Sequence, residues 1–182
     1  MTRRIVLIRH GESTFNEAFD VTGRDPNIVD APLTEKGRQQ ALSIRDRVRR
    51  MDIELLLVSP LSRAIQTALL IASSSRQRIE VEPLCREGLF SSCDIGRAPA
   101  ELALHFENLQ FNHLAPDWWE RFQDERLSIP ETDRTFLSRI AVLRQSLIGR
   151  PEEILAIIGH ASLFRRLCGR HLANCEITEI AL

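Results

Sequence analysis

Three short apolar runs constrain the fold of this chain of 182 residues more than any other feature. They span residues 5–8, 55–58 and 154–158, and each leads into a polar residue and then into a stretch that can form a helix. Such runs are typical of strands buried on both faces of a parallel sheet. Parallel strands need crossovers, and helix-compatible segments lie between the runs. The sequence therefore predicts an α/β fold with a mostly parallel central sheet.

Four segments carry the end signals of helices. Thr34 is a good N-cap for the first, and Pro60 fits the first turn of the second, at residues 61–68. Gly149 and Gly169 mark the ends of the third and the fourth. The residues whose spacing indicates amphipathic helices are Ala41, Ile44, Val48 and Met51 in the first, and Leu137, Ile140, Ala141, Arg144 and Leu147 in the third.

Two further segments, residues 79–82 and 176–182, alternate apolar and polar residues as strands near a sheet edge do. The length fits one domain, so we expect residues 1–182 to form a single domain. The formal net charge of -1 gives no overall bias toward nucleic acid or a membrane. The apolar runs are too short for a signal peptide or a membrane span, and we expect a cytoplasmic protein.

The four cysteines, Cys85, Cys93, Cys168 and Cys175, form no Cys-x-x-Cys pair that would suggest zinc or a redox motif. We expect free thiols, because the expected compartment is reducing. The sequence also contains no visible ligand cluster for zinc or magnesium, so we expect neither a metal nor a cofactor.

Residues suited to an anion site follow the first apolar run. Arg9 offers a planar charged fork that matches phosphate, and His10 offers a ring nitrogen that can attack phosphorus. Gly11 lets the backbone turn close to a ligand. Ser13 and Asn16 supply hydrogen-bonding groups near the start of an expected helix, where backbone donors favour an anion. Because ligands bind at the carboxyl edge of such sheets, these residues predict a phosphate site there.

Residues 9–11, which read Arg-His-Gly, resemble the signature of the histidine phosphatase superfamily, also called the phosphoglycerate mutase-like family. Residues 59–64 (Ser-Pro-Leu-Ser-Arg-Ala) and 159–161 (Gly-His-Ala) match further motifs of this family. The resemblance covers nearly the whole chain and implies a three-layer sandwich with helices on both faces of the sheet. Many members carry glycine where this chain has Ala161.

The resemblance implies a role for each matching residue. His10 is expected to attack phosphorus in line and to become a transient phosphohistidine. Arg9 and Arg63 are expected to bind the transferred phosphate, as guanidinium groups do well. His160 is expected to donate a hydrogen bond to a nonbridging phosphate oxygen. Nearby arginines would keep His10 neutral for the attack, because they repel a further positive charge.

Two acidic residues compete for the role of proton donor. Glu87 fits the position where many family members carry an acid that protonates the leaving alcohol. Those members continue with an aromatic-Glu-Gly segment, whereas residues 89–96 of this chain read differently and contain Asp94. If both carboxyl groups approach the phosphate, their repulsion would raise the pKa of one of them. We favour Glu87.

The segment at about residues 89–131 matches the variable insert with which the family caps its site. It is rich in aromatic residues, which either line a pocket beside the phosphate or pack in the core, and core packing is the more common outcome. Arg97, in the same segment, is a candidate for reading a second anionic group.

A phosphatase acting on a small phosphomonoester is the function that the sequence favours. Phosphoglycerate mutases of the family are longer and carry an Arg-Glu-x-x-Tyr-Gly-like block, whereas this chain has no tyrosine. Mutase-type phosphoryl transfer is one alternative, and a non-catalytic phosphate-binding module that retains the fold is another. The expected partner is a small phosphorylated substrate, with no nucleic acid and no membrane, and a homodimer remains open.

Overall fold

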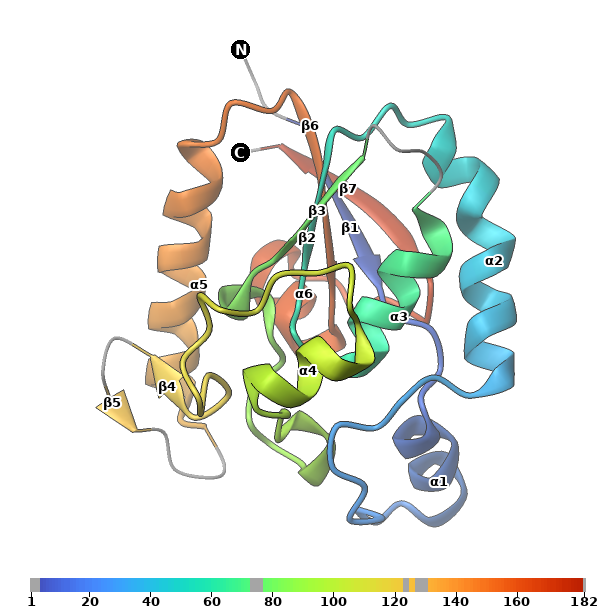
Figure 1. Cartoon of the computed structure of the whole chain (residues 1–182), viewed down its shortest axis with the longest axis vertical. Helices are drawn as coiled ribbons and strands as arrows, with labels where there is room; N and C mark the ends of the chain where they lie inside the picture. The colour runs from blue at the N-terminus through green and yellow to red at the C-terminus, as the bar shows by residue number, and fades with distance from the viewer. Residues whose placement is uncertain (1–3, 73–76, 123–124, 127–130, 182) are drawn as a thin grey trace.

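A five-stranded sheet forms the centre of the computed structural model, which describes residues 4–72, 77–122, 125–126 and 131–181 (Figure 1). The described residues form seven strands, five of which make up this sheet. They are β1 (Arg4–Arg9), β2 (Leu55–Val58), β3 (Arg78–Val81), β4 (Arg121–Phe122), β5 (Glu125–Arg126), β6 (Ile154–Gly159) and β7 (Ile177–Ala181). The order across the sheet is β3-β2-β6-β1-β7, and β4 and β5 pair separately. All neighbouring pairs in the sheet are parallel except β1 and β7. The predicted mostly parallel α/β sheet is therefore confirmed.

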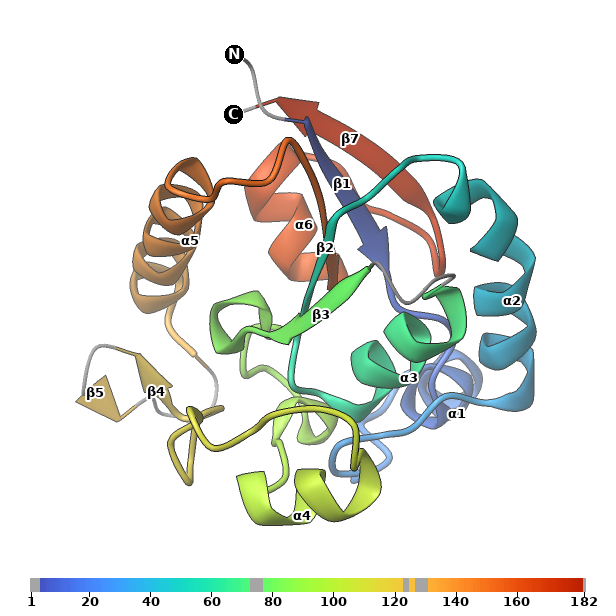
Figure 2. The same cartoon turned by 45° about the horizontal axis from the view of Figure 1, so that its top comes forward.

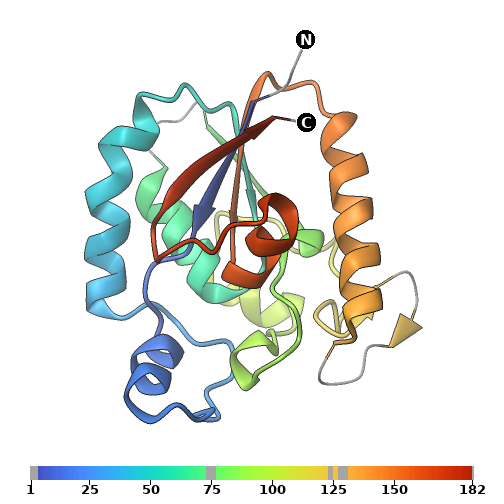
Figure 3. The same cartoon turned by 180° about the vertical axis from the view of Figure 1, so that it is seen from behind.

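Helices cover both faces of the sheet and make the three-layer sandwich (Figure 2). They are α1 (Thr14–Thr22), α2 (Glu35–Arg49), α3 (Ser62–Ile71), α4 (Pro99–His105), α5 (Asp133–Ile148) and α6 (Ala161–Cys168), with short 3-10 turns η1 (Pro83–Cys85) and η2 (Ser92–Asp94). α2 and α3 lie on one face, and α5 and α6 lie on the other (Figure 3). α1 and α4 lie beyond the carboxyl ends of the parallel strands (Figure 1).

The central strands are apolar along their buried lengths because each contributes to two separate cores. Successive side chains of a strand point to opposite faces. Val6 and Ile8 of β1 therefore pack with α2 and α3, whereas Ile5 and Leu7 pack with α5 and α6. A polar residue at any of these positions would be buried on one face or the other.

Several predicted boundaries and one predicted helix face need correction. Pro60 lies outside its helix, since Leu61 is the N-cap and α3 starts at Ser62. The first edge strand ends at Val81 because the Glu82 side chain turns back to accept a hydrogen bond from the Leu84 N–H, 3.0 Å away. The helix before Gly149 starts as early as Asp133, where the Thr132 side chain caps it.

The predicted stripe of α5 is wrong in part. Leu137 is 48% exposed, and Ala141 is exposed as well. The face that packs on the sheet instead consists of Phe136, Arg139, Ile140, Leu143 and Leu147. The fully buried Arg139 explains the error. Arginine is rarely buried without an ionic partner, and the partner of Arg139 is not recognisable in the sequence.

The aromatic segment before β4 belongs mostly to the core. Phe111 and Trp118 are buried in the cluster that includes α3, and Phe106 and Trp119 pack against the same cluster. Phe90 is the exception, since 41% of it is exposed. The side chain of Phe122, part of the same expectation, lies outside the described residues.

All four cysteines are free thiols, as predicted. No helix in residues 4–72, 77–122, 125–126 or 131–181 combines the length and the apolar character needed to cross a membrane.

Two glycines allow α2 to contact the loop after β1. A Cβ atom on Gly37 would lie 2.0 Å from the Glu12 carbonyl oxygen, and one on Gly11 would lie 2.4 Å from the Gly37 carbonyl oxygen. Thr34, the N-cap of α2, donates its backbone N–H to the same Glu12 oxygen at 3.0 Å. The first turn of α2 therefore determines the position of the loop that follows His10.

We predict that Gly37→Ala destabilises the protein by about 1–3 kcal/mol, because backbone must move to admit the methyl group. The sign is opposite to helix propensity, which favours alanine by about 1 kcal/mol. The free energy of unfolding in urea measures the effect. Gly149→Ala is the matched control, because the nearest atom to its Cβ would be 3.8 Å away. Equal stability of the two variants would refute the steric argument.

Candidate active site

The register of three neighbouring strands brings the predicted site residues to one edge of the sheet. Arg9 of β1 is paired with Gly159 of β6, so His10 and His160 follow the ends of adjacent strands. The His10 N–H donates to the Gly159 carbonyl at 3.0 Å, and the two imidazole centroids are 5.1 Å apart. Ser59 follows β2 on the other side of β6.

His10 is buried, and its hydrogen bonds define one tautomer. Nδ1 lies 2.7 Å from the Gly11 carbonyl oxygen, which can only accept, so Nδ1 carries the proton. Arg63 Nε lies 3.3 Å from Nε2 and can only donate, so Nε2 presents its lone pair. Burial, and then the charges of Arg63 and Arg9, hold the pKa of His10 well below its ordinary value. The ring is neutral with Nε2 unprotonated.

Arg63, at the start of α3, is buried between three partners. Besides its bond to His10, it donates from Nη1 to the Cys93 carbonyl at 2.6 Å and from Nη2 to Asp94 Oδ1 at 3.0 Å. Asp94 Oδ2 accepts from the N–H groups of Phe90 and Ser91. Asp94 thus lies in the site, where it orients Arg63.

Arg9 and His160 each have a buried nitrogen that makes no hydrogen bond within the described part of the chain: Arg9 Nε and His160 Nδ1. One other nitrogen of each residue is engaged, since Arg9 Nη1 donates to the Leu172 carbonyl at 2.8 Å and His160 Nε2 lies 2.7 Å from Ser59 Oγ. Burial, followed by the charge of Arg63, lowers the pKa of His160 well below its ordinary value. Buried polar atoms are seldom left unpaired in folded proteins, so these two nitrogens are candidates to bind a ligand.

Glu87 lies at the N-terminus of α6 with a half-buried side chain. Its carboxylate accepts from the N–H groups of Ser162 at 2.9 Å, and of Leu163 and Gly88 at 3.0 Å each. Burial, and then the charge of Asp94, raise the pKa of Glu87 above its ordinary value, although these hydrogen bonds oppose the change. A carboxyl group of raised pKa can hold a proton and deliver it.

An ionic cluster that binds the backbone around Glu87 was not predicted from the sequence. Arg139 of α5 is fully buried and donates to the carbonyls of Leu84, Arg86 and Glu87 at 2.9, 2.8 and 3.1 Å. Its charge is matched by Glu131, which is 3.1 Å away and also accepts from the Leu89 N–H. The cluster fixes the backbone on both sides of Glu87. No motif marked Arg139 or Glu131, because burial of a charge is not visible in sequence.

Ser13 and Asn16 cap α1. Ser13 Oγ accepts from the Asn16 N–H at 3.2 Å, and Asn16 Oδ1 accepts from the Ser13 N–H at 3.1 Å, which completes a capping box. The side-chain amide nitrogen of Asn16 makes no hydrogen bond to any residue in the described ranges. The predicted contact of these residues with phosphate remains a prediction.

Asp30 is a further residue of the site region whose role was not predicted. It is buried with a φ of 44° and accepts from the Ser62 N–H at 2.8 Å, which fixes the start of α3 next to Arg63. Arg97 Nε donates to the same carboxylate at 3.0 Å. Arg97, a sequence candidate for reading an anion, therefore already has an ionic partner.

Comparison with known proteins gives matches across nearly the whole chain. The model of the histidine phosphatase superfamily (branch 1) matches residues 5–181. A probable phosphoglycerate mutase GpmB of Erwinia tasmaniensis is 29% identical over 196 residues, covering 97% of this chain and 84% of that protein. The 2,3-bisphosphoglycerate-dependent phosphoglycerate mutase 1 of Arabidopsis thaliana is 39% identical over 74 residues, or 41% of this chain and 21% of that protein.

Solved structures show the same fold at low sequence identity. The mycobacterial glucosyl-3-phosphoglycerate phosphatase Rv2419c aligns with a TM-score of 0.67 at 20% identity, covering 100% of this chain and 91% of that one. A putative alpha-ribazole-5'-P phosphatase from Escherichia coli aligns with a TM-score of 0.66 at 21% identity, covering 97% and 89%. Since the family model extends from β1 to β7, the chain belongs to the histidine phosphatase superfamily.

Proposed function

We propose that this protein is a phosphatase that hydrolyses a small phosphomonoester through a phosphohistidine on His10. The observation that carries the proposal is the lone pair of His10 Nε2, which the Gly11 carbonyl and Arg63 keep unprotonated beside buried positive charge. A nucleophile in phosphoryl transfer needs an unprotonated lone pair, which the substrate phosphorus would take over from the Arg63 N–H, and the transferred group needs positive charge beside its oxygens.

The reaction proceeds in two displacements. His10 Nε2 forms a bond to phosphorus while the bond to the ester oxygen breaks, and the proton of Glu87 passes to that oxygen. Water then attacks the phosphohistidine, gives a proton to the Glu87 carboxylate and releases phosphate, which restores His10. The protons balance over the cycle, because Glu87 gives one proton in the first step and regains one in the second.

The phosphate oxygens have candidate donors on several sides. Arg63 retains N–H groups beyond the three that it uses, because a guanidinium carries five. Arg9 Nε and His160 Nδ1, two buried nitrogens that make no hydrogen bond within the described residues, would be satisfied by the same anion if His160 carries its proton on Nδ1. Ser13 and the Asn16 amide are further proposed ligands. This donor set supports stabilisation of charge in the transition state.

Glu87 is the proposed acid in preference to Asp94. Asp94 is bound to Arg63 and to two backbone N–H groups, so its role is to orient the guanidinium. Glu87 is the more exposed of the two residues and lies at the start of α6, beside the motif that contains His160.

Phosphoglycerate mutase-type transfer is a second candidate, favoured by the names of the curated relatives. The same His10 intermediate would then be captured by a hydroxyl group of the sugar acid instead of water, with Glu87 as the base. A non-catalytic module would retain the fold without forming the intermediate.

We predict that His10→Ala lowers the hydrolysis of a generic aryl phosphate at least about 1,000-fold, because the nucleophile is lost. Brief reaction of the wild type with labelled substrate, stopped in alkaline denaturant, should leave label on His10. His105→Ala, an exposed histidine, is the control and should keep full activity. If wild type and His10→Ala were equally active or equally inert, the catalytic proposal would fail.

Glu87→Gln should separate substrates by their leaving groups. We expect a loss of about 100- to 10,000-fold on an alkyl phosphate, which needs the proton, and a much smaller loss on an activated aryl phosphate. Wild-type activity on the alkyl substrate should fall as the pH rises through the raised pKa of Glu87, and the variant should lack this limb. Asp94→Asn is the comparison, and it should impair both substrates alike through Arg63. If the fall in activity at high pH were lost in Asp94→Asn and kept in Glu87→Gln, Asp94 would be the acid.

Partitioning of the labelled enzyme distinguishes a phosphatase from a mutase. We expect the phospho-enzyme to release inorganic phosphate at a rate that added phosphoglycerate leaves unchanged. Transfer of most of the label to phosphoglycerate would identify a mutase and overturn the phosphatase proposal.

A further inference from the structure

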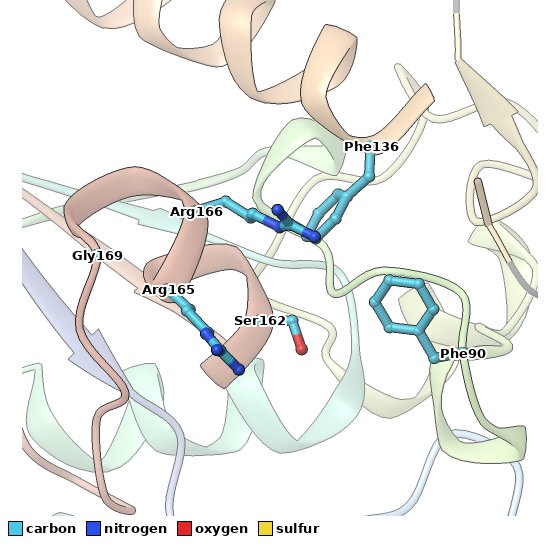
Figure 4. Close-up of a pocket in the computed structure, with 6 residues that line it drawn as sticks. All are labelled: Phe90, Phe136, Ser162, Arg165, Arg166 and Gly169. Carbon is cyan, nitrogen blue, oxygen red and sulfur yellow. The ribbon is translucent and has the colours of Figure 1, made fainter. Parts of the chain in front are cut away.

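A groove beside the candidate site is not explained by phosphate binding. It encloses about 370 Å³, within the range of sites for small molecules. It lies between α6, the start of α5 and the loop that carries Phe90 (Figure 4). Its lining residues are Phe90, Phe136, Ser162, Arg165, Arg166 and Gly169.

One end of the groove is lined by a residue that binds the proposed proton donor. Ser162, which lines it, donates its backbone N–H to Glu87 Oε2 at 2.9 Å. Phe90 follows Glu87 by three residues, and its ring covers Gly88, where a Cβ atom would lie 2.2 Å from the ring. In-line attack places the leaving oxygen on the side of phosphorus opposite His10, within reach of the acid. The leaving group therefore emerges next to this groove.

The groove combines an aromatic wall with one available cation. Phe90 is 41% exposed, and its ring meets that of Phe136 edge to face. Arg166 is neutralised by Asp133 at 2.6 Å. Arg165 is exposed and forms no ion pair with any residue in the described ranges. Ser162 and Arg165 lie one turn apart on α6 and face the same side of the groove, with Phe90 across from them (Figure 4).

We propose that this groove is a leaving-group subsite that selects phosphomonoesters with an aromatic or apolar body and a second anionic group. The body packs against Phe90, and the anion, a carboxylate or a second phosphate, binds Arg165. The proposal rests on the proposed function, because it needs the leaving group beside Glu87. A guanidinium suits either anion through paired hydrogen bonds.

The test compares kcat/KM for phenyl phosphate and for carboxyphenyl phosphates, which differ only in the second anion. Wild type should prefer a carboxylated substrate about 10-fold, the size of one charge-assisted hydrogen bond. Arg165→Gln should abolish this preference, and Arg165→Lys should keep part of it. Arg45→Gln, on an exposed face of α2, is the control and should change neither rate nor preference.

The outcomes separate this inference from the proposed function. Hydrolysis of all substrates through His10 with no preference, or a preference that survives in Arg165→Gln, would overturn the subsite and leave the phosphatase intact. Absence of hydrolysis of every substrate by the wild type would overturn both.

Discussion

The two hydrogen bonds that determine the tautomer of His10 are the interactions on which the rest of the site depends. The Gly11 carbonyl holds the proton on Nδ1, and Arg63 Nε donates to the unprotonated Nε2. The Gly11 N–H in turn donates to Thr67 Oγ1 at 3.1 Å, which joins the loop to α3, the helix that carries Arg63. A protonated His10 would repel Arg63 and Arg9. These two cations can therefore lie beside the ring only while it is neutral.

Buried charges organise the opposite side of the site at a cost in solvation. Arg139 and Glu131 are both buried, and an ion pair of this kind contributes little net stability once desolvation is counted. Its contribution is geometric, because Arg139 donates to three backbone carbonyls, those of Leu84, Arg86 and Glu87. Glu87 is thereby held at the N-terminus of α6, between the phosphate pocket and the groove that contains Arg165.

Much of the fold was predictable because its signals are local. Runs such as residues 55–58 are apolar at every position only when both faces of a strand are buried. Thr34 marks a helix start because its side chain caps the first turn, and Gly169 marks a helix end because it adopts a left-handed backbone conformation. α5 was the exception. Its buried face contains Arg139, and the partner that makes this burial tolerable, Glu131, is recognisable only in the folded chain.

The sequence by itself determined the family, the mostly parallel sheet and the placement of four site residues at one edge, namely Arg9, His10, Arg63 and His160. These features follow from strand order and motif spacing, which are local properties of the chain. Tertiary structure alone decided which nitrogen of His10 is unprotonated, that Asp94 is bound to Arg63, and that Arg97 is paired with Asp30, whereas Arg165 forms no ion pair with the residues that the structure describes. The physical reason is that protonation, burial and ion pairing depend on distances between residues far apart in the chain, which no local pattern encodes.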